Sequence, residues 1–208
     1  MAEQQIGRSG SVDGSGQRWP DHDGSPVMTS GAAFGVSPSQ TVGPFLHLAL
    51  ADPAEALVVP VGTSGGIWVR GTVTDGNGDP VADAVVETWQ ASTGARPVPD
   101  GFSGFGRCPT DDDGRWAVHT VKPGPVPGAG RRWEAPHLTV SVFARGLLDR
   151  VVTRIYFADE DAANAADPVL AELVEPARRP TLVAGVTEDG YHFAVRLQGE
   201  DETVFFAL

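Results

Sequence analysis

The chain has 208 residues, of which 27 are acidic and 15 are basic, so its formal net charge is −12 at pH 7. This excess of negative charge argues against binding to nucleic acids or anionic membranes, because both require clustered Lys and Arg side chains. Hydrophobic residues make up 41%, and the 26 glycines and 17 prolines suit a core of many short strands joined by tight turns.

The cysteine content and the apolar runs indicate the redox chemistry and the cellular location to expect. Cys108 is the only cysteine, so an internal disulfide is excluded, and we expect a structural thiol there. The sequence contains no apolar run of 18 residues and no apolar stretch typical of a signal peptide near its start. We therefore expect a cytoplasmic protein without a membrane span.

The first part of the chain is poor in apolar residues. Residues 1–34 are rich in Gly, Ser, Asp and Gln, and such a segment cannot bury enough surface to offset its ordering entropy. We expect a flexible tail over 1–34 and one domain over 35–208. Residues 37–50, with Pro38 and Pro44, predict an extended arm that packs against another surface, because proline interrupts regular helices and central strands.

Strand patterns recur from residue 66 onward. A Gly/Asn/Asp-rich turn over 75–80 between two apolar runs predicts a hairpin of 67–74 with 84–91. A second hairpin is expected around Gly146, and the complete set of expected strands is 67–74, 84–91, 115–121, 138–145, 151–157, 191–197 and 203–207. Little helix is expected: a turn or two over 159–166, then a short helix over 169–174 with Asp167 as N-cap and Pro168 in the first turn. The pattern indicates an all-β fold, an antiparallel β-sandwich with short helices and an N-terminal arm.

Local motifs for catalysis or metal binding are weak. The histidines do not form a His-x-His pair, which would place two imidazoles on one face of a strand. Three aspartates at 111–113 lack the spacing of a calcium loop, and with Gly114 they are typical of a polar turn. Residue chemistry alone therefore predicts a soluble, acidic β-sandwich and no assembled catalytic site.

Several segments taken together resemble the intradiol ring-cleavage dioxygenases. They are SPSQTVGPFLHLAL at 37–50, VRGTVTDGNGDPVADAVVETWQA at 69–91, FSGFGRCPTDDDGRWAVHTVKPG at 102–124, APHLTVSVFARGLLDRVVTRIYFADE at 135–160 and QGEDETVFFAL at 198–208. The resemblance covers nearly everything after residue 35, in order. It implies a role in cleaving 3,4-dihydroxybenzoate (protocatechuate) with O₂ to 3-carboxy-cis,cis-muconate.

The resemblance also implies which chain holds the metal. Catalytic members bind Fe(III) through two tyrosines and a His-x-His pair, and here His137 is followed by Thr139. The resemblance places one family tyrosine near Trp116 and the other between Trp89 and Cys108, where this sequence has no tyrosine. One histidine cannot fix a ferric ion. We therefore expect no metal ligand and no catalytic residue in this chain, and Fe(III) in a partner β subunit of αβ protomers that form a larger oligomer.

The resemblance assigns this chain a share of the substrate pocket. It implies that Thr41, Gly43, Pro44 and Phe45 wall the pocket and that Arg145 binds substrate, since a guanidinium pairs bidentately with a carboxylate. From the sequence alone, Arg145 reads as a solvated charge at a strand end and the arm as a packed linker.

Two alternatives remain open at this point. One is a transthyretin-like binding module without an enzymatic role. The other is a self-sufficient dioxygenase with unusual ligands such as His119, His137 and Tyr191.

Overall fold

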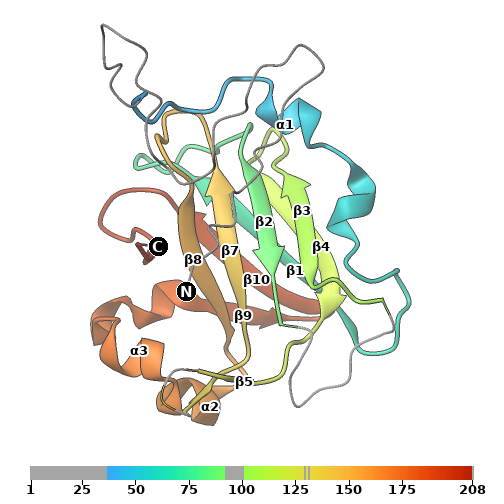
Figure 1. Ribbon diagram of the computed structural model, residues 1–208, viewed down its shortest axis with the longest axis vertical. Helices are drawn as coiled ribbons and strands as arrows, with labels where there is room; N and C mark the ends of the chain where they lie inside the picture. Colours follow the sequence, from blue (N-terminus) through green and yellow to red (C-terminus); the bar gives the residue numbers. More distant parts are fainter. Residues whose placement is uncertain (1–36, 92–100, 129, 131, 208) are drawn as a thin grey trace, which may run out of the picture. The chain divides into compact units, whose positions relative to one another are not determined.

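The computed structural model describes residues 37–91, 101–128, 130 and 132–207, and Figure 1 shows their arrangement. A boundary in the internal contacts falls between Pro38 and Ser39, and all the described helices and strands lie in the part from Ser39 onward. The expected tail over 1–34 lies outside the described residues. None of the described helices is long and apolar enough to cross a bilayer.

Strands dominate this part of the chain, as expected. The helical segments are α1 (Leu46–Ala49), α2 (Asp161–Ala166), α3 (Pro168–Glu172) and the 3₁₀ segments η1 (Pro53–Ala56) and η3 (Pro176–Leu182). The strands are β1 (Gly66–Thr74), β2 (Val85–Trp89), β3 (Phe105–Pro109), β4 (Arg115–Val121), β5 (Val126–Pro127), β6 (Trp133–Glu134), β7 (His137–Phe143), β8 (Val151–Phe157), β9 (Val183–Thr187) and β10 (Gly190–Arg196).

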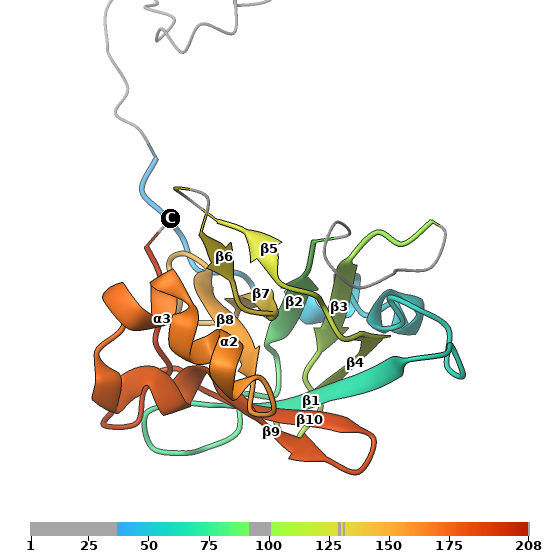
Figure 2. The same cartoon turned by 90° about the horizontal axis from the view of Figure 1, so that it is seen from below.

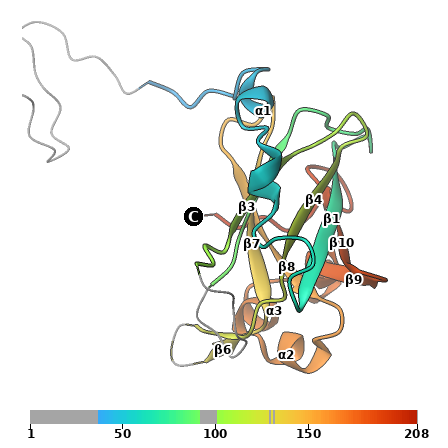
Figure 3. The same ribbon diagram turned by 90° about the vertical axis from the view of Figure 1, so that its right-hand side faces the viewer.

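Eight strands form one strongly bent sheet in the order β3-β2-β7-β8-β9-β10-β1-β4, and β5 pairs with β6. The two ends of this sheet, β3 and β4, lie in contact, so the sheet is a sandwich closed almost to a barrel (Figures 2 and 3). The expected antiparallel sandwich is right in part: most neighbouring strands are antiparallel, but β8–β9 and β1–β10 are parallel pairs. The parallel β8–β9 pair follows a connection over 158–182 that contains α2, α3 and η3, because parallel neighbours need a long crossover and cannot be joined by a tight turn.

The core follows the two-residue period of the strands. In β7, Leu138, Val140 and Val142 point inward and are at most 1% exposed, whereas the alternating residues point outward. A second cluster lies on the outer face of β8 beneath the helical segments and consists of Ala135, Tyr156, Leu170, Val174 and Leu182. The outer face of β7 and β8 is therefore covered only in part, and it carries the polar residues discussed below.

The first expected hairpin is wrong. The turn after β1 forms, with the Asp75 carboxylate accepting hydrogen bonds from the backbone N–H groups of Asn77 and Asp79 at 2.9 Å each. However, β2 pairs with β3 and β7 instead of with β1. Because β10 and β4 already occupy both edges of β1, the chain must cross to the other half of the sandwich.

Of the other local predictions, some are confirmed and some are wrong. The antiparallel β7–β8 hairpin is confirmed, as is the N-cap at Asp167, whose carboxylate accepts from Val169 and Leu170. Residues 203–207 do not form a strand; isolated hydrogen bonds hold them, such as Phe206 N–H to the Val152 carbonyl at 2.8 Å and the Thr153 hydroxyl to the Val204 carbonyl at 2.7 Å. The arm is not extended throughout, because α1 starts just beyond Pro44, where no further proline blocks a helical turn.

Candidate functional site

The arm and the β7–β8 turn meet at one end of the sandwich (Figure 1). The backbone N–H of Gly146 donates a hydrogen bond of 2.7 Å to Oγ1 of Thr41. Gly146 has a φ of +90°, a left-handed conformation that glycine adopts without strain, and it follows Arg145 directly. The structure therefore places Thr41 beside the segment of Arg145, although the two are far apart in the sequence.

Arg145 itself projects from the turn. Its side chain is 63% exposed, and its Nε forms an ion pair with the carboxylate of Asp83, which is 14% exposed. The ion pair uses Nε of Arg145, so the other N–H groups of the guanidinium can bind an anion that approaches from solvent. The geometry is compatible both with a structural ion pair and with a binding role.

The rest of the predicted arm presents apolar surface. Phe45 is 73% exposed and Leu48 is 63% exposed, and a Cβ added at Gly43 would meet no atom within 4 Å. Pro44 is also exposed. This exposed apolar end of the arm has the character of a surface that is covered in a complex, because soluble chains seldom leave large apolar groups together in water.

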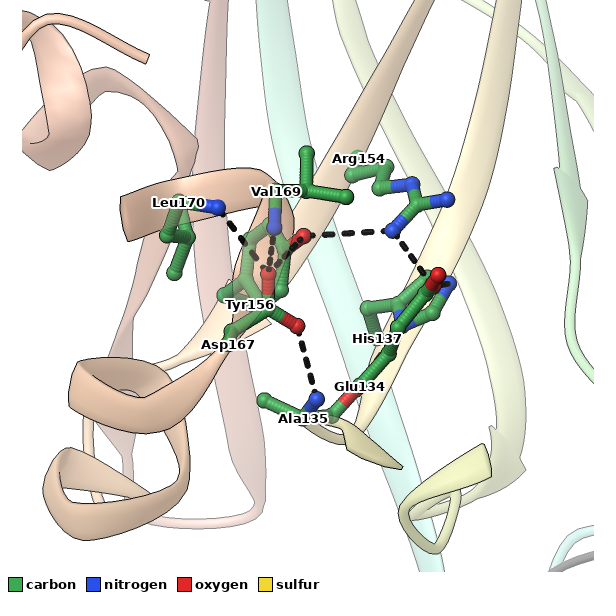
Figure 4. A network of polar contacts seen from close by, with 8 residues as sticks. All are labelled: Glu134, Ala135, His137, Arg154, Tyr156, Asp167, Val169 and Leu170. Atoms are coloured by element: carbon green, nitrogen blue, oxygen red, sulfur yellow. Dashed lines mark hydrogen bonds and ion pairs between the residues drawn. The ribbon is translucent and has the colours of Figure 1, made fainter. Parts of the chain in front are cut away.

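A polar network occupies the outer face of β8 near His137 (Figure 4). Asp167 is fully buried, and its carboxylate accepts hydrogen bonds from the N–H groups of Val169 (2.8 Å), Leu170 (2.9 Å) and Ala135 (2.7 Å). The hydroxyl of Tyr156 donates to the same carboxylate at 3.2 Å. A buried carboxylate is tolerated because these four donors replace water, and the carboxylate thereby joins α3 and β8 to the segment between β6 and β7.

Arg154 and Glu134 complete this network. Nη1 of Arg154 lies 2.7 Å from Oε2 of Glu134 and donates to the hydroxyl oxygen of Tyr156 at 3.3 Å. His137 places Nδ1 2.8 Å from the carbonyl oxygen of Ala135, and its Nε2 lies 3.8 Å from Glu134. Burial lowers the pKa of His137, and the nearby Arg154 cation lowers it further.

This arrangement does not fit the ferric ion of the catalytic members. His137 offers one imidazole, the next residue of β7 on the same face is Thr139, and the nearby carboxylate of Glu134 is already paired with Arg154. Burial raises the pKa of Tyr156 far above its ordinary value, which disfavours the phenolate that would bind a metal. In the described part of the chain, no group of three or more His, Cys, Asp or Glu side chains could hold a metal ion.

The other residues singled out in the sequence are dispersed. Trp116 is 3% exposed and lies in the main core, separate from the network around His137. His119 contacts the Val59 carbonyl through Nδ1 at 2.9 Å, and the Tyr191 hydroxyl bonds to Asp159 at 3.0 Å, so the two do not converge with His137 on a common centre.

The aspartates at 111–113 form a turn. The carboxylate of Asp111 accepts from the N–H groups of Asp113 and Arg115 at 3.0 and 2.8 Å, and these bonds close the β3–β4 connection. This matches the polar turn expected from the sequence.

The Glu134–Arg154 pair was not foreseen as part of any site. Strand alternation could have indicated that Arg154 and Thr139 face outward, but their proximity depends on the β7–β8 register, which pairs Thr139 with Arg154. Asp167 was recognised as a helix cap, whereas its bonds to Ala135 and Tyr156 depend on tertiary packing.

Comparisons with known proteins find a family and relatives for most of the chain. A family model described as Dioxygenase matches residues 44–199. The protocatechuate 3,4-dioxygenase alpha chain of Pseudomonas putida is 43% identical over 191 residues, which cover 82% of this chain and 95% of the relative. The beta chain of that enzyme from Burkholderia cepacia is 35% identical over 156 residues, which cover 66% of each protein.

Solved structures share the fold. The dioxygenase domain of a dioxygenase and carbohydrate-binding protein fusion from Streptomyces sp. SirexAA-E superposes with a TM-score of 0.53 at 24% identity, covering 83% of this chain and 97% of that chain. Catechol 1,2 dioxygenase from Acinetobacter radioresistens gives a TM-score of 0.51 at 18% identity, covering 67% of this chain and 54% of that chain. At these identities the likeness concerns architecture alone.

Proposed function

This chain belongs to the intradiol ring-cleavage dioxygenases, and we propose that it is the iron-free, α-type subunit of an enzyme that cleaves protocatechuate with O₂ to 3-carboxy-cis,cis-muconate. The observation that carries the proposal is the 43% identity to an alpha chain, combined with a donor set around His137 that does not suit Fe(III). The ferric ion and the ring chemistry then reside in a β-type partner, for which the 35% identical beta chain is a precedent.

The contribution of this chain is to wall the substrate pocket of that partner. The arm residues Thr41, Gly43, Pro44 and Phe45 form the wall, and exposed apolar groups such as Phe45 become buried in the complex. Arg145 pairs with the carboxylate of protocatechuate through the part of its guanidinium that Asp83 leaves open. The hydrogen bond between Thr41 and Gly146 supports this proposal, because it holds the wall beside the proposed binding cation.

A two-chain reconstitution tests the proposal. The chain is purified alone and together with a β-type chain that carries the His-x-His pair, and iron content and protocatechuate consumption are measured for each. We expect substoichiometric iron and no turnover for the chain alone, and iron with full turnover for the complex of αβ protomers. Iron near one atom per isolated chain, with colour that depends on added catechol, would overturn the assignment.

The transthyretin-like binding module is the weaker candidate, because the comparisons identify dioxygenase chains over most of the sequence. It predicts a stable chain that has no affinity for a β-type partner. Co-purification of the two chains in a fixed stoichiometry distinguishes these candidates, and a cytoplasmic location in the source cell is part of the same proposal.

A further inference from the structure

A small pocket lies over the outer face of β7 and β8, next to the polar network of Figure 4. Its volume is about 290 Å³. Strand residues form its floor, and the helix α3 and the C-terminal segment form its other walls. The lining consists of Thr139, Val152, Arg154, Val169, Leu173, Phe206 and Ala207.

The cation in this pocket has unused hydrogen-bonding capacity. Both hydrogen bonds of Arg154 use Nη1, one to Glu134 and one to Tyr156. Within the part of the chain that the structure describes, Nη2 and Nε of Arg154 have no partner, although the side chain is only 23% exposed. A guanidinium carries five N–H donors, and neither of these two nitrogens is among the fully buried polar atoms that lack a partner, so both are open to a ligand from solvent.

A second polar group lies beside Arg154. Thr139 is its direct register partner across β7 and β8, and the Thr139 side chain is outward-facing and half-buried. Its hydroxyl makes no hydrogen bond with the residues described in the structure. A free cationic edge and a free hydroxyl thus lie together, and the remaining lining side chains are apolar.

We propose that this pocket binds a small monocarboxylate with an apolar body, of the size of benzoate. The carboxylate pairs with Nε and Nη2 of Arg154 in the side-on geometry that a guanidinium favours, and the Thr139 hydroxyl donates to one of its oxygens. The apolar body lies against Val152, Val169 and Phe206. Few polar groups converging in a mainly apolar pocket are typical of small-ligand sites, and this volume suits a compact ligand.

The inference uses only residues of this chain and does not rest on the proposed function. It also assigns a role to Thr139, which stands where the catalytic members are expected to have a second histidine. A hydroxyl next to a guanidinium recognises an anion, whereas an imidazole pair would recognise a cation.

Binding of 4-fluorobenzoate to the full chain, followed by ¹⁹F NMR, tests the proposal. We expect saturable binding at one site per chain, with a Kd on the order of 0.1–1 mM for a ligand of this size. Thr139→Val should weaken binding about 5-fold through the loss of one hydrogen bond, and Arg154→Lys about 10-fold or more through the loss of the bidentate fork. Circular dichroism and urea midpoints identify any variant that fails to fold, and Thr139→Val, on a partly open sheet face, remains informative if Arg154→Lys unfolds.

Thr72→Val is the matched control. Thr72 is also an outward-facing strand residue and lines a different hollow of about 470 Å³ on the β1–β10 half of the sandwich, so its replacement should leave 4-fluorobenzoate binding unchanged. Absence of saturable binding, or equal affinity in wild type and in folded Thr139→Val, would overturn the proposal. Iron content and turnover of the reconstituted two-chain complex are read separately, so loss of those activities with retained ligand binding counts against the proposed function alone.

Discussion

Replacing Arg145 with alanine in the two-chain enzyme should raise KM for protocatechuate with little loss of stability. The Arg145 side chain is 63% exposed, and exposed ion pairs contribute about 0–1 kcal/mol, so the free energy of unfolding should fall by less than about 1 kcal/mol. A charge-assisted hydrogen-bonded pair with a substrate carboxylate contributes about 1.5–3 kcal/mol. This corresponds to a rise in KM of about 10- to 150-fold if substrate binding equilibrates.

Two further variants distinguish a role of Arg145 in substrate binding from a role of its ion pair with Asp83 in shaping the β7–β8 turn. Asp83→Asn releases the guanidinium from its partner, so KM should stay the same or fall, because Arg145 then has more freedom to pair with substrate. Arg145→Lys keeps the charge and loses the planar fork, so its KM should lie between those of wild type and Arg145→Ala.

Initial rates of protocatechuate consumption give KM and kcat, and urea unfolding of the same preparations gives stability. An unchanged KM in folded Arg145→Ala would remove the binding role of this residue. A KM that rises equally in Asp83→Asn would show that the ion pair only shapes the turn.

Three predictions concern the fold. Asp167→Ala removes the acceptor of four hydrogen bonds and should lower the free energy of unfolding by about 3–5 kcal/mol, measured by urea denaturation. The control is Asp161→Ala at an exposed position of α2, which should change the free energy of unfolding by less than about 0.5 kcal/mol. Burial and a neighbouring cation lower the pKa of His137 in the folded chain, so the unfolded chain binds more protons as the pH falls below about 6.5. The free energy of unfolding should therefore decrease as the pH drops through this range. His137→Gln should reduce this pH dependence, measured as urea midpoints at several pH values. A Cβ on Gly71 would lie 2.0 Å from a backbone oxygen of the adjacent strand. Gly71→Ala should therefore lower the free energy of unfolding by at least about 3 kcal/mol, measured by thermal or urea unfolding. Gly185→Ala should be tolerated, because a Cβ there would meet no atom within 4 Å.

Some local structure was predicted correctly from local sequence patterns. The β7–β8 hairpin and the cap at Asp167 follow from strand alternation and from the preference of a carboxylate followed by proline for a helix start. The residues paired in the hairpin are at most 19 positions apart, from His137 to Tyr156, and the cap involves only neighbouring residues, so the sequence carries the relevant signal directly.

The sequence did not predict which strands distant in the chain are neighbours in the sheet. The turn over 75–80 was recognised, but its flanking strands separate because both edges of β1 are occupied by strands from elsewhere in the chain. The parallel entry of β9 likewise depends on the helical connection before it. Alternation shows which face of a strand is buried and leaves its neighbours undetermined.

The candidate site shows the same division. The resemblance selected Arg145 and the arm residues, and the hydrogen bond from Gly146 to Thr41 places the two segments together; their roles in binding substrate stay predictions. The Asp83 carboxylate was not anticipated, because the pairing of an exposed guanidinium depends on the surface neighbours that folding brings to it.

The network around His137 explains why a ferric ion would be a poor competitor there. A metal at this position would have to displace Arg154 from Glu134 and remove the proton of Tyr156, whose pKa is raised by burial. It would also bring a cation next to a guanidinium whose charge already balances the local carboxylate. Restoring one imidazole by Thr139→His would leave these obstacles in place, so that variant alone should not give the chain stoichiometric iron. Stoichiometric iron in Thr139→His would show that the missing histidine, and not the Arg154–Glu134 pair, is what keeps the metal out.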